Sequence, residues 1–245
     1  MIIERFLAGR RQDELSPEEL AALEAMVERT IRIEPRALAA RHGEPMDHSM
    51  LLIEGVMCRV MASKGERQIV GLHFPGDFVD LHAFPLRVLD HDLVAMNACT
   101  MATFKHSAIE TLIERFPNLG RQLWFSTLLD AAMHREWIFR LGRLNAIGRV
   151  AHLLAESERR LRMVGLSDDG AFDLPLQQTD VASICGITPV HANRVLRSLR
   201  EQGLATFAGG KAKILDLARL ADVAEFDDDY LYPSTLQAQR AGAQP

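Results

Sequence analysis

The sequence has only three cysteines and no long hydrophobic run. Cys58, Cys99 and Cys185 lie far apart and form no Cys-x-x-Cys pair, so the sequence predicts neither a disulfide framework nor a zinc knuckle. No apolar stretch approaches the ~18 residues that a membrane-spanning helix needs. The first residues also lack the basic segment and apolar stretch of a secretory signal. We therefore expect a cytoplasmic protein that does not enter the membrane.

Motifs typical of common enzymes are absent from the sequence as well. It contains no Gly-x-Ser-x-Gly, no P-loop and no Gly-x-Gly-x-x-Gly. The composition, with 48% hydrophobic and 25% charged residues, is that of an ordinary globular protein. The sequence thus predicts a folded protein that is not an enzyme and has no catalytic residues.

Charge is unevenly distributed along the chain. The formal net charge is −5, yet residues 142–215 hold ten Lys or Arg against seven Asp or Glu. Residues 216–229 hold six acids and one Arg. The basic excess indicates the third of the chain that an anionic partner would approach. The acidic segment near the end of the chain, Glu225-Phe226-Asp227-Asp228-Asp229-Tyr230, would repel DNA, and we expect it to pack elsewhere or to touch a partner.

Residues 31–105 have the pattern of β-structure. Short apolar segments alternate with turn signals, among them His42-Gly43-Glu44-Pro45, Lys64-Gly65-Glu66 and Pro75-Gly76-Asp77. Short strands at this near-regular spacing predict an all-β roll or barrel. A short helical lead-in is expected before it, starting at Ser16-Pro17.

Helical periodicity replaces this pattern after residue 106. Pro117 suits the first turn of a helix, and apolar residues recur at four-residue spacing from Leu119 to Leu141. A helix this long and this apolar must be covered, either by its own domain or by a symmetry mate that forms a dimer seam. The pattern is not a clean heptad, so the register of such a seam stays open. Another helix is expected at 145–163, followed by a polar loop at 165–170.

Residues 177–200 have the pattern of a helix-turn-helix. A short helix with Val181 and Ile184 inward reaches Gly186, which allows a tight turn. Thr188-Pro189 is then a strong start signal for a second helix. In a helix-turn-helix, this second helix enters the major groove of double-stranded DNA. Residues 203–215 follow as a β-hairpin, which is expected to act as a wing.

The outward side of the second helix and the wing carry the predicted DNA contacts. Arg194 can present its fork to guanine O6 and N7, a contact worth about 1–3 kcal/mol of discrimination. Arg197 and the wing lysines are expected to neutralise phosphates. The predicted set comprises Thr188, Val190, His191, Asn193, Arg194, Arg197, Lys211 and Lys213.

These motifs together resemble the Crp–Fnr (cyclic AMP receptor protein/fumarate–nitrate reductase regulator) family of transcription factors. The resemblance covers roughly residues 15–220. Besides the long helix and the winged helix-turn-helix, it is carried by Gly43-Glu44, Ile53-Glu54-Gly55, Gly65 and Pro75-Gly76-Asp77-Phe78. It implies a homodimer that binds a palindromic DNA site and senses a signal in its first domain. It also implies RNA polymerase as a partner.

The resemblance also implies an α+β fold with three parts and a tail. Residues 1–106 would form a cyclic-nucleotide-binding-like β-roll (jelly roll) that acts as the sensor. Residues 107–142 would hold a linker helix and the long dimerisation helix, and residues 143–222 the winged helix-turn-helix. An acidic and then polar tail would occupy residues 223–245.

The chain departs from the family pattern in its candidate ligand-binding segment, residues 79–92. Members that bind cyclic nucleotides carry a Glu for the ribose and an Arg-Ser pair for the phosphate. Here Leu81 stands at the Glu position and no Arg-Ser follows, leaving Arg87 as a candidate substitute. A cyclic phosphate buried without a fixed cation keeps an unpaired charge, so we expect no cyclic nucleotide. Residues 1–57 contain no cysteine, which argues against the iron–sulfur branch.

The recognition helix departs from the family pattern at Val190. Members that read a cytosine place a Glu there, and Val190 would touch a thymine methyl instead. Cys185 is expected to pack in the core, with a redox-sensing thiol as the alternative.

Two alternatives stay open for the β-roll. One alternative is a haem or redox sensor with the same DNA-binding output. A haem is possible because the roll contains four histidines, His42, His73, His82 and His91. The other is a metal-dependent enzyme of the cupin kind, which usually shows a His-x-His with a downstream Glu. This chain has no His-x-His and no carboxylate at a fixed spacing from its histidines, so we predict no cofactor and no metal site.

Overall fold

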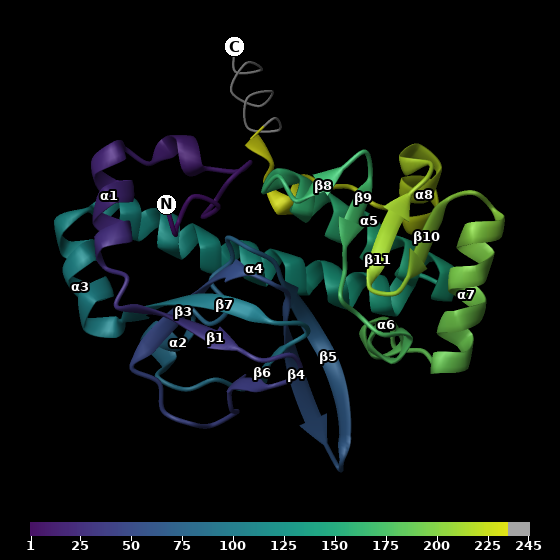
Figure 1. Ribbon diagram of the computed structural model, residues 1–245, viewed down its shortest axis with the longest axis horizontal. Helices are drawn as coiled ribbons and strands as arrows, with labels where there is room; N and C mark the ends of the chain where they lie inside the picture. The colour runs from purple at the N-terminus through teal and green to yellow at the C-terminus, as the bar shows by residue number, and fades with distance from the viewer. Residues whose placement is uncertain (235–245) are drawn as a thin grey trace. The chain divides into compact units, whose positions relative to one another are not determined.

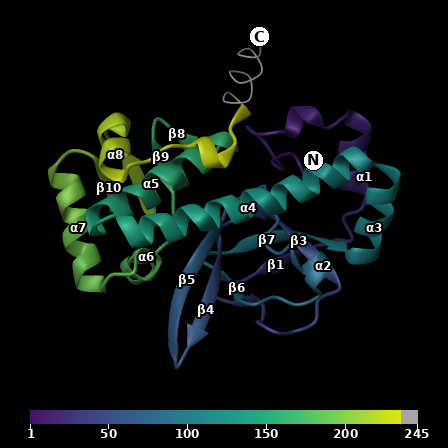
Figure 2. The same ribbon diagram turned by 180° about the vertical axis from the view of Figure 1, so that it is seen from behind.

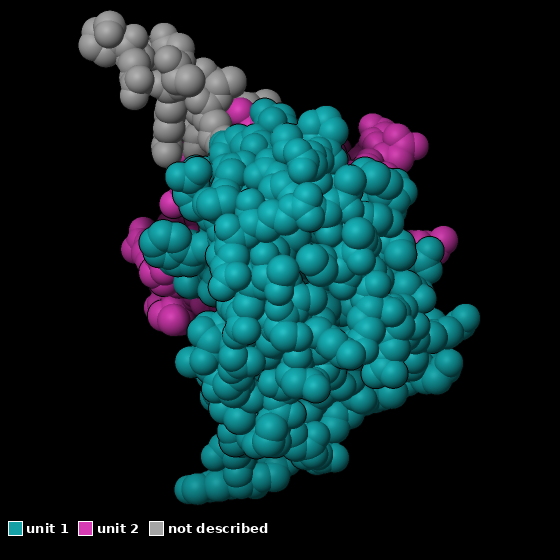
Figure 3. Space-filling view, turned by 90° about the vertical axis from the view of Figure 1, so that its left-hand side faces the viewer, with its two compact units in different colours: residues 1–66, 71–131 teal, residues 67–70, 132–245 magenta. Residues whose placement is uncertain are grey.

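The protein, seen here in a computed structural model that describes residues 1–234, forms two compact units. One unit holds residues 1–66 and 71–131, and the other holds residues 67–70 together with the chain from 132 onward (Figure 3). The last part of the predicted tail, residues 235–245, lies outside the described residues. Within the described part of the chain, no helix combines the length and the apolar character needed to cross a membrane.

The first unit is built around two antiparallel sheets (Figure 1). Their strand orders are β1-β7-β3 and β2-β6-β4-β5, which confirms the predicted β-roll. The strands are β1 (Arg29–Ile33), β2 (Leu38–Ala40), β3 (His48–Glu54), β4 (Met57–Ser63), β5 (Glu66–His73), β6 (Asp92–Ala95) and β7 (Cys99–Lys105).

Helices flank these strands along the chain. They are α1 (Pro17–Ala25), α2 (Ala83–Leu86), α3 (His106–Arg115) and the first half of α4 (Pro117–Arg143). The predicted start of α1 is confirmed, because the Ser16 hydroxyl accepts a hydrogen bond from the Glu19 amide while the Glu19 carboxylate accepts one from the Ser16 amide.

Two apolar clusters hold this unit together. In the first, the rings of Phe6 and Phe104 pack against Phe78 with centroids 5.5 and 5.3 Å away, and Leu119 and Leu123 of α4 join them. The second lies inside the roll and is formed mainly by methionine and leucine side chains, including Met50, Leu52, Met57, Leu93 and Met101. The first half of α4 is thus anchored in the core of the β-roll.

Helix α4 is one uninterrupted rod (Figure 2). A row of its residues recurs at alternating steps of three and four and is largely exposed. The row consists of Arg121, Trp124, Leu128, Ala131, Arg135, Ile138 and Gly142. Trp124 and Ile138 are 66% and 71% exposed, which is unusual for side chains of this size. These residues therefore recur at heptad spacing along one face of the helix.

The second unit contains the remaining elements. They are the second half of α4, α5 (Ala146–Met163), β8 (Ser167–Asp168), β9 (Ala171–Asp173), α6 (Gln178–Cys185), α7 (Pro189–Glu201), β10 (Ala205–Ala208), β11 (Lys211–Ile214) and α8 (Leu217–Ala224). The strands form one antiparallel sheet in the order β10-β11-β9-β8.

The prediction of a polar loop at residues 165–170 was wrong. Strands β8 and β9 form a hairpin whose turn residues, Asp169 and Gly170, have φ of +45° and +71°. Two successive residues with positive φ are typical of a tight hairpin turn. Strand β9 also pairs with β11, so this hairpin widens the wing sheet.

The acidic segment after α8 packs on α5 of its own unit. The Asp228 carboxylate pairs with Arg159 at 2.5 Å, and the Tyr230 hydroxyl donates to Glu156 at 2.7 Å. Glu156 is buried, and burial would raise its pKa, but the guanidinium groups of Arg140 and Arg160 outweigh this and hold the pKa low. The segment is therefore a structural part of the second unit.

Candidate DNA interface

The turn between α6 and α7 has the geometry that the sequence predicted. Gly186 ends α6 with a φ of +61°, a conformation that costs glycine little. Val181 and Ile184 of α6 are buried, as expected. The two helices are also tied by a hydrogen bond from Asn193 Nδ2 to Gln178 Oε1 at 3.0 Å. Asn193 is therefore half-buried between the helices and less available for a base than predicted.

Helix α7 begins at the predicted residue. The Thr188 hydroxyl accepts a hydrogen bond from the His191 amide at 3.2 Å, and Pro189 occupies the first helical position. Ala192, Val195, Leu196 and Leu199 are buried. One side of α7 is thus anchored in the unit and the other is presented outward.

The outward side of α7 is basic. Arg194, Arg197 and Arg200 are exposed, and none of their guanidinium groups makes a hydrogen bond or ion pair within residues 1–234. Val190 is 63% exposed at the start of the helix. Guanidinium groups held on a rigid rod without a protein partner are well placed to bind an anion or a base edge.

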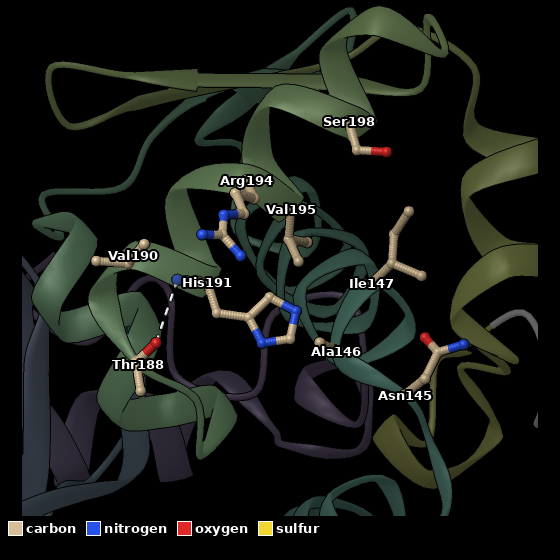
Figure 4. A pocket seen from close by; sticks show the side chains of 9 residues that line it. All are labelled: Asn145, Ala146, Ile147, Thr188, Val190, His191, Arg194, Val195 and Ser198. Carbon is tan, nitrogen blue, oxygen red and sulfur yellow. Dashed lines mark hydrogen bonds between the residues drawn. The ribbon is translucent and has the colours of Figure 1, made fainter.

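A groove of about 660 Å³ runs between α7 and the start of α5 (Figure 4). It is lined by Asn145, Ala146, Ile147, Thr188, Val190, His191, Arg194, Val195 and Ser198. The structure thus brings Thr188, Val190, His191 and Arg194 together, whereas Asn193, Arg197 and the wing lysines lie outside the groove. The His191 ring projects from α7 toward the first turn of α5.

Helix α5 also lines this groove, which the sequence did not predict. Its N-terminus faces the groove, and Asn145 caps it by accepting a hydrogen bond from the Gly148 amide at 3.0 Å. The first amides of a helix point outward and favour an anion. The signal was present, because Asn145 is a good capping residue, but nothing in the sequence placed it beside α7.

The wing carries fewer unpaired charges than predicted. Gly209 and Gly210 form its tip with φ of +60° and +75°. Lys211 lies 4.0 Å from the Asp173 carboxylate, and Lys213 lies 3.5 Å from that of Asp169. Both acids belong to the β8-β9 hairpin, and all four side chains are at least 48% exposed. Pairs this exposed exchange readily, so the lysines can turn to a phosphate.

Comparisons with known proteins agree with this architecture. Residues 30–116 match the family model of the cyclic nucleotide-binding domain, and residues 148–223 match that of the Crp-like helix-turn-helix domain. The chain is 32% identical to the transcriptional activator protein FnrL of Cereibacter sphaeroides over 76% of this chain and 77% of that protein. It is 31% identical to the nitrogen fixation regulation protein FixK of Bradyrhizobium diazoefficiens over 71% and 72% of the two chains.

The chain belongs to the Crp–Fnr family of transcription regulators. Members of this family typically act as homodimers on palindromic DNA. The fold is that of a solved relative, FixK2 from Bradyrhizobium japonicum, with a TM-score of 0.72 at 24% identity over 80% of this chain and 96% of that one.

Two arginines of the β-roll in this Crp–Fnr regulator, Arg59 and Arg87, each contact a carboxylate of the protein. Arg59 is buried, but it donates to the Asp130 carboxylate at 2.5 Å and to the Val79 carbonyl at 2.8 Å. Arg87, the candidate substitute, is exposed and contacts His106 and Glu110 at 3.2 Å each. A cyclic phosphate would have to displace a carboxylate from the buried Arg59, whereas the Arg87 pair is exposed and exchanges readily.

Cys185 lies on the buried side of α6. Burial raises the pKa of its thiol to about 11, although Arg140 and Arg149 act in the opposite direction. The thiolate, which is the species that oxidants attack, is therefore scarce at pH 7. This environment favours the packing role over the redox role.

Proposed function

We propose that this chain regulates transcription as a homodimer whose two α7 helices read successive major grooves of a palindromic site. The observation that carries the proposal is the division of α7. Its aliphatic side is buried, while Arg194 and Arg197 are exposed and have no partner within residues 1–234. These two guanidinium groups can therefore bind an external anionic surface. Duplex DNA presents both phosphates and base edges to them.

Each contact has a distinct chemical role. Arg194 lies in the groove and presents two donors to guanine O6 and N7. Val190 contacts a thymine methyl, and His191 lies between base edges and backbone. The first turn of α5, capped by Asn145, receives a phosphate at the edge of the groove. Arg197, Lys211 and Lys213 neutralise further phosphates.

The test compares Arg194→Ala with Arg197→Ala in a selection from random duplexes, followed by binding titrations. Arg194→Ala removes the preference for one guanine in each half-site, a loss of about 5- to 150-fold in discrimination. Arg197→Ala weakens all sequences about equally and reduces the salt dependence by about one phosphate contact per protomer. Arg29→Ala, an exposed arginine of β1, is the control and leaves binding unchanged. An Arg194→Ala protein that keeps the wild-type sequence preference overturns the assignment.

We further propose that the exposed row on α4 forms the dimer seam. Trp124, Leu128 and Ile138 expose 66%, 51% and 71% of their surface, and a second copy of α4 would cover them. Ile138→Asp places a charge in this seam and converts the dimer to a monomer in light-scattering measurements. Leu86→Asp changes an apolar side chain that is 63% exposed elsewhere and leaves the dimer intact. Equal masses for the two variants refute the seam.

The output of this binding is a change in initiation by RNA polymerase. Support comes from the relatives, of which FnrL is named a transcriptional activator. The function is one of binding rather than catalysis, and it places the chain in the cytoplasm with the DNA. Transcription in vitro from a selected site upstream of a weak promoter, with Arg194→Ala as the matched control, measures this output. A transcript level that does not respond to wild-type protein contradicts it.

A further inference from the structure

Two histidines and an aspartate converge in the β-roll beside the start of α2. His82 precedes α2, and Asp90 and His91 precede β6. One ligand atom of each side chain lies within 4.8 Å of those of the other two. The centroids of the two imidazole rings lie 5.3 Å apart, and the ring planes are tilted by 40°. The sequence suggested no metal site because no carboxylate stood at a fixed spacing from the histidines, but the fold brings His82 to the neighbouring residues Asp90 and His91.

His91 is the central residue of this cluster. Its Nδ1 bonds to the Asp90 carboxylate at 2.7 Å. Its Nε2 is buried and has no hydrogen-bond partner in the part of the chain that the structure describes. A carboxylate on one ring nitrogen orients the other nitrogen and raises its basicity, which is the usual arrangement around a metal-binding histidine. An unsatisfied buried nitrogen is also costly unless a ligand meets it.

Charges of both signs lie around the cluster. Asp90 is one carboxylate, and Asp130 of α4 is a second whose charge acts on both histidines. The Arg59 guanidinium acts on both histidines more strongly than either carboxylate, and it is paired with Asp130 at 2.5 Å. The Arg59–Asp130 pair is close to neutral as a whole, which leaves the Asp90 carboxylate as the negative charge bonded to His91. Burial, followed by the charge of Arg59, lowers the pKa of His82 to about 4 and also lowers that of His91.

We propose that His82 and His91, supported by Asp90, bind a divalent transition-metal ion of the Zn²⁺ or Co²⁺ class. Imidazole nitrogen is a preferred ligand for these ions, whereas Mg²⁺ and Ca²⁺ prefer oxygen. His91 binds through Nε2 and His82 through its own ring, and water completes the coordination. Ligand atoms lie about 2.0–2.2 Å from zinc, so the side chains close slightly around the ion. Asp90 is exposed and His82 half-buried, which gives the ion a path from solvent.

The test uses the untagged full-length protein, freed of metal by a chelator. Co²⁺ titration reports coordination through its visible absorption bands, and Zn²⁺ titration by calorimetry gives the stoichiometry and affinity. We expect one ion per chain. His82→Gln and His91→Gln each lose this binding, and Asp90→Asn weakens it about 10- to 100-fold. His42→Gln changes an exposed histidine of the same unit and leaves binding unchanged.

Circular dichroism of each variant distinguishes loss of the site from loss of the fold. His91 is buried, so its replacement carries the larger folding risk, whereas Asp90 is exposed and its replacement does not. Two results overturn the proposal. One is a wild-type protein that binds neither ion with micromolar affinity or better. The other is a set of folded His82→Gln and Asp90→Asn proteins that bind as tightly as wild type. DNA binding is not part of this readout, so its outcome is independent of the proposed function.

Discussion

Replacing Asp80 with asparagine is expected to remove a pH dependence from the stability of the β-roll. Asp80 is fully buried, and one of its oxygens accepts a hydrogen bond from the Met50 amide at 2.7 Å. The other oxygen has no hydrogen-bond partner within residues 1–234. Burial raises the pKa of this carboxyl to about 7, although the Met50 amide and Arg59 both act to lower it. The folded protein therefore holds a proton that the unfolded chain releases near pH 4.

The size of the effect follows from the two pKa values. Since the folded pKa is the higher one, the free energy of unfolding is greatest below about pH 4 and falls as the pH rises to about 7. The pKa of Asp80 is raised from an ordinary value of 3.8 to about 7, and each pKa unit corresponds to about 1.4 kcal/mol. The free energy of unfolding therefore falls by about 4 kcal/mol in total. About 2–3 kcal/mol of this is lost between pH 5 and pH 8. Asparagine keeps the acceptor for Met50 but has no such proton to lose.

Urea unfolding of the full chain at pH 5 and pH 8, followed by circular dichroism, measures this prediction. The amide group of asparagine adds a buried donor and costs about 1–3 kcal/mol at both pH values. The difference in the free energy of unfolding between Asp80→Asn and wild type should nevertheless shift by about 2–3 kcal/mol in favour of Asp80→Asn when the pH is raised from 5 to 8. His82 and His91 also titrate differently in the folded and unfolded chains, but they are present in both proteins. The difference in the free energy of unfolding between variant and wild type therefore reports on Asp80. Asp13→Asn, at an exposed site, should show no such gain. A constant difference between Asp80→Asn and wild type would refute the reasoning.

Three further predictions follow from local geometry. Gly55→Ala lowers the free energy of unfolding of the roll by more than ~1 kcal/mol, because φ is +93° and a Cβ would lie 2.6 Å from a backbone oxygen. Gly43→Ala is the comparison, because φ is +78° there but the space around it is open. Thermal unfolding should show the smaller loss of stability for Gly43→Ala. Thr188→Ala removes the cap of α7 and lowers the free energy of unfolding by ~1 kcal/mol, whereas Thr188→Ser keeps it. Cys185, with its pKa raised to about 11 by burial, reacts with a thiol reagent at pH 8 only when the protein unfolds.

Each of these has a clear contrary result. Equal melting temperatures for the two glycine variants would show that the close approach at Gly55 is relieved at no cost. A Thr188→Ser protein as unstable as Thr188→Ala would assign the loss to the methyl group rather than to the capping oxygen. Rapid modification of Cys185 in the folded protein would mean that α6 opens far more often than its packing indicates.

The sequence predicted the local structure of the DNA-binding unit well, because local structure depends on neighbouring residues. Gly186 and Thr188-Pro189 determine where one helix ends and the next begins, and the structure has both features at these residues. The 3.6-residue period likewise separated the buried side of α7 from its outward side, which bears Arg194 and Arg197. These features require no knowledge of distant parts of the chain.

Tertiary structure alone decided which distant side chains meet. Asp173 lies beside Lys211, and Tyr230 lies on Glu156, because sheet register and helix packing place them there. The same holds for His82, whose contact with His91 depends on how the chain after α2 returns to β6. Such contacts depend on the closure of long loops and on the fit of a whole core, which the periodicity of one segment does not encode. For this reason the sequence predicted the DNA-reading helix, whereas the paired wing lysines, the docked acidic segment and the histidine cluster emerged only with the fold.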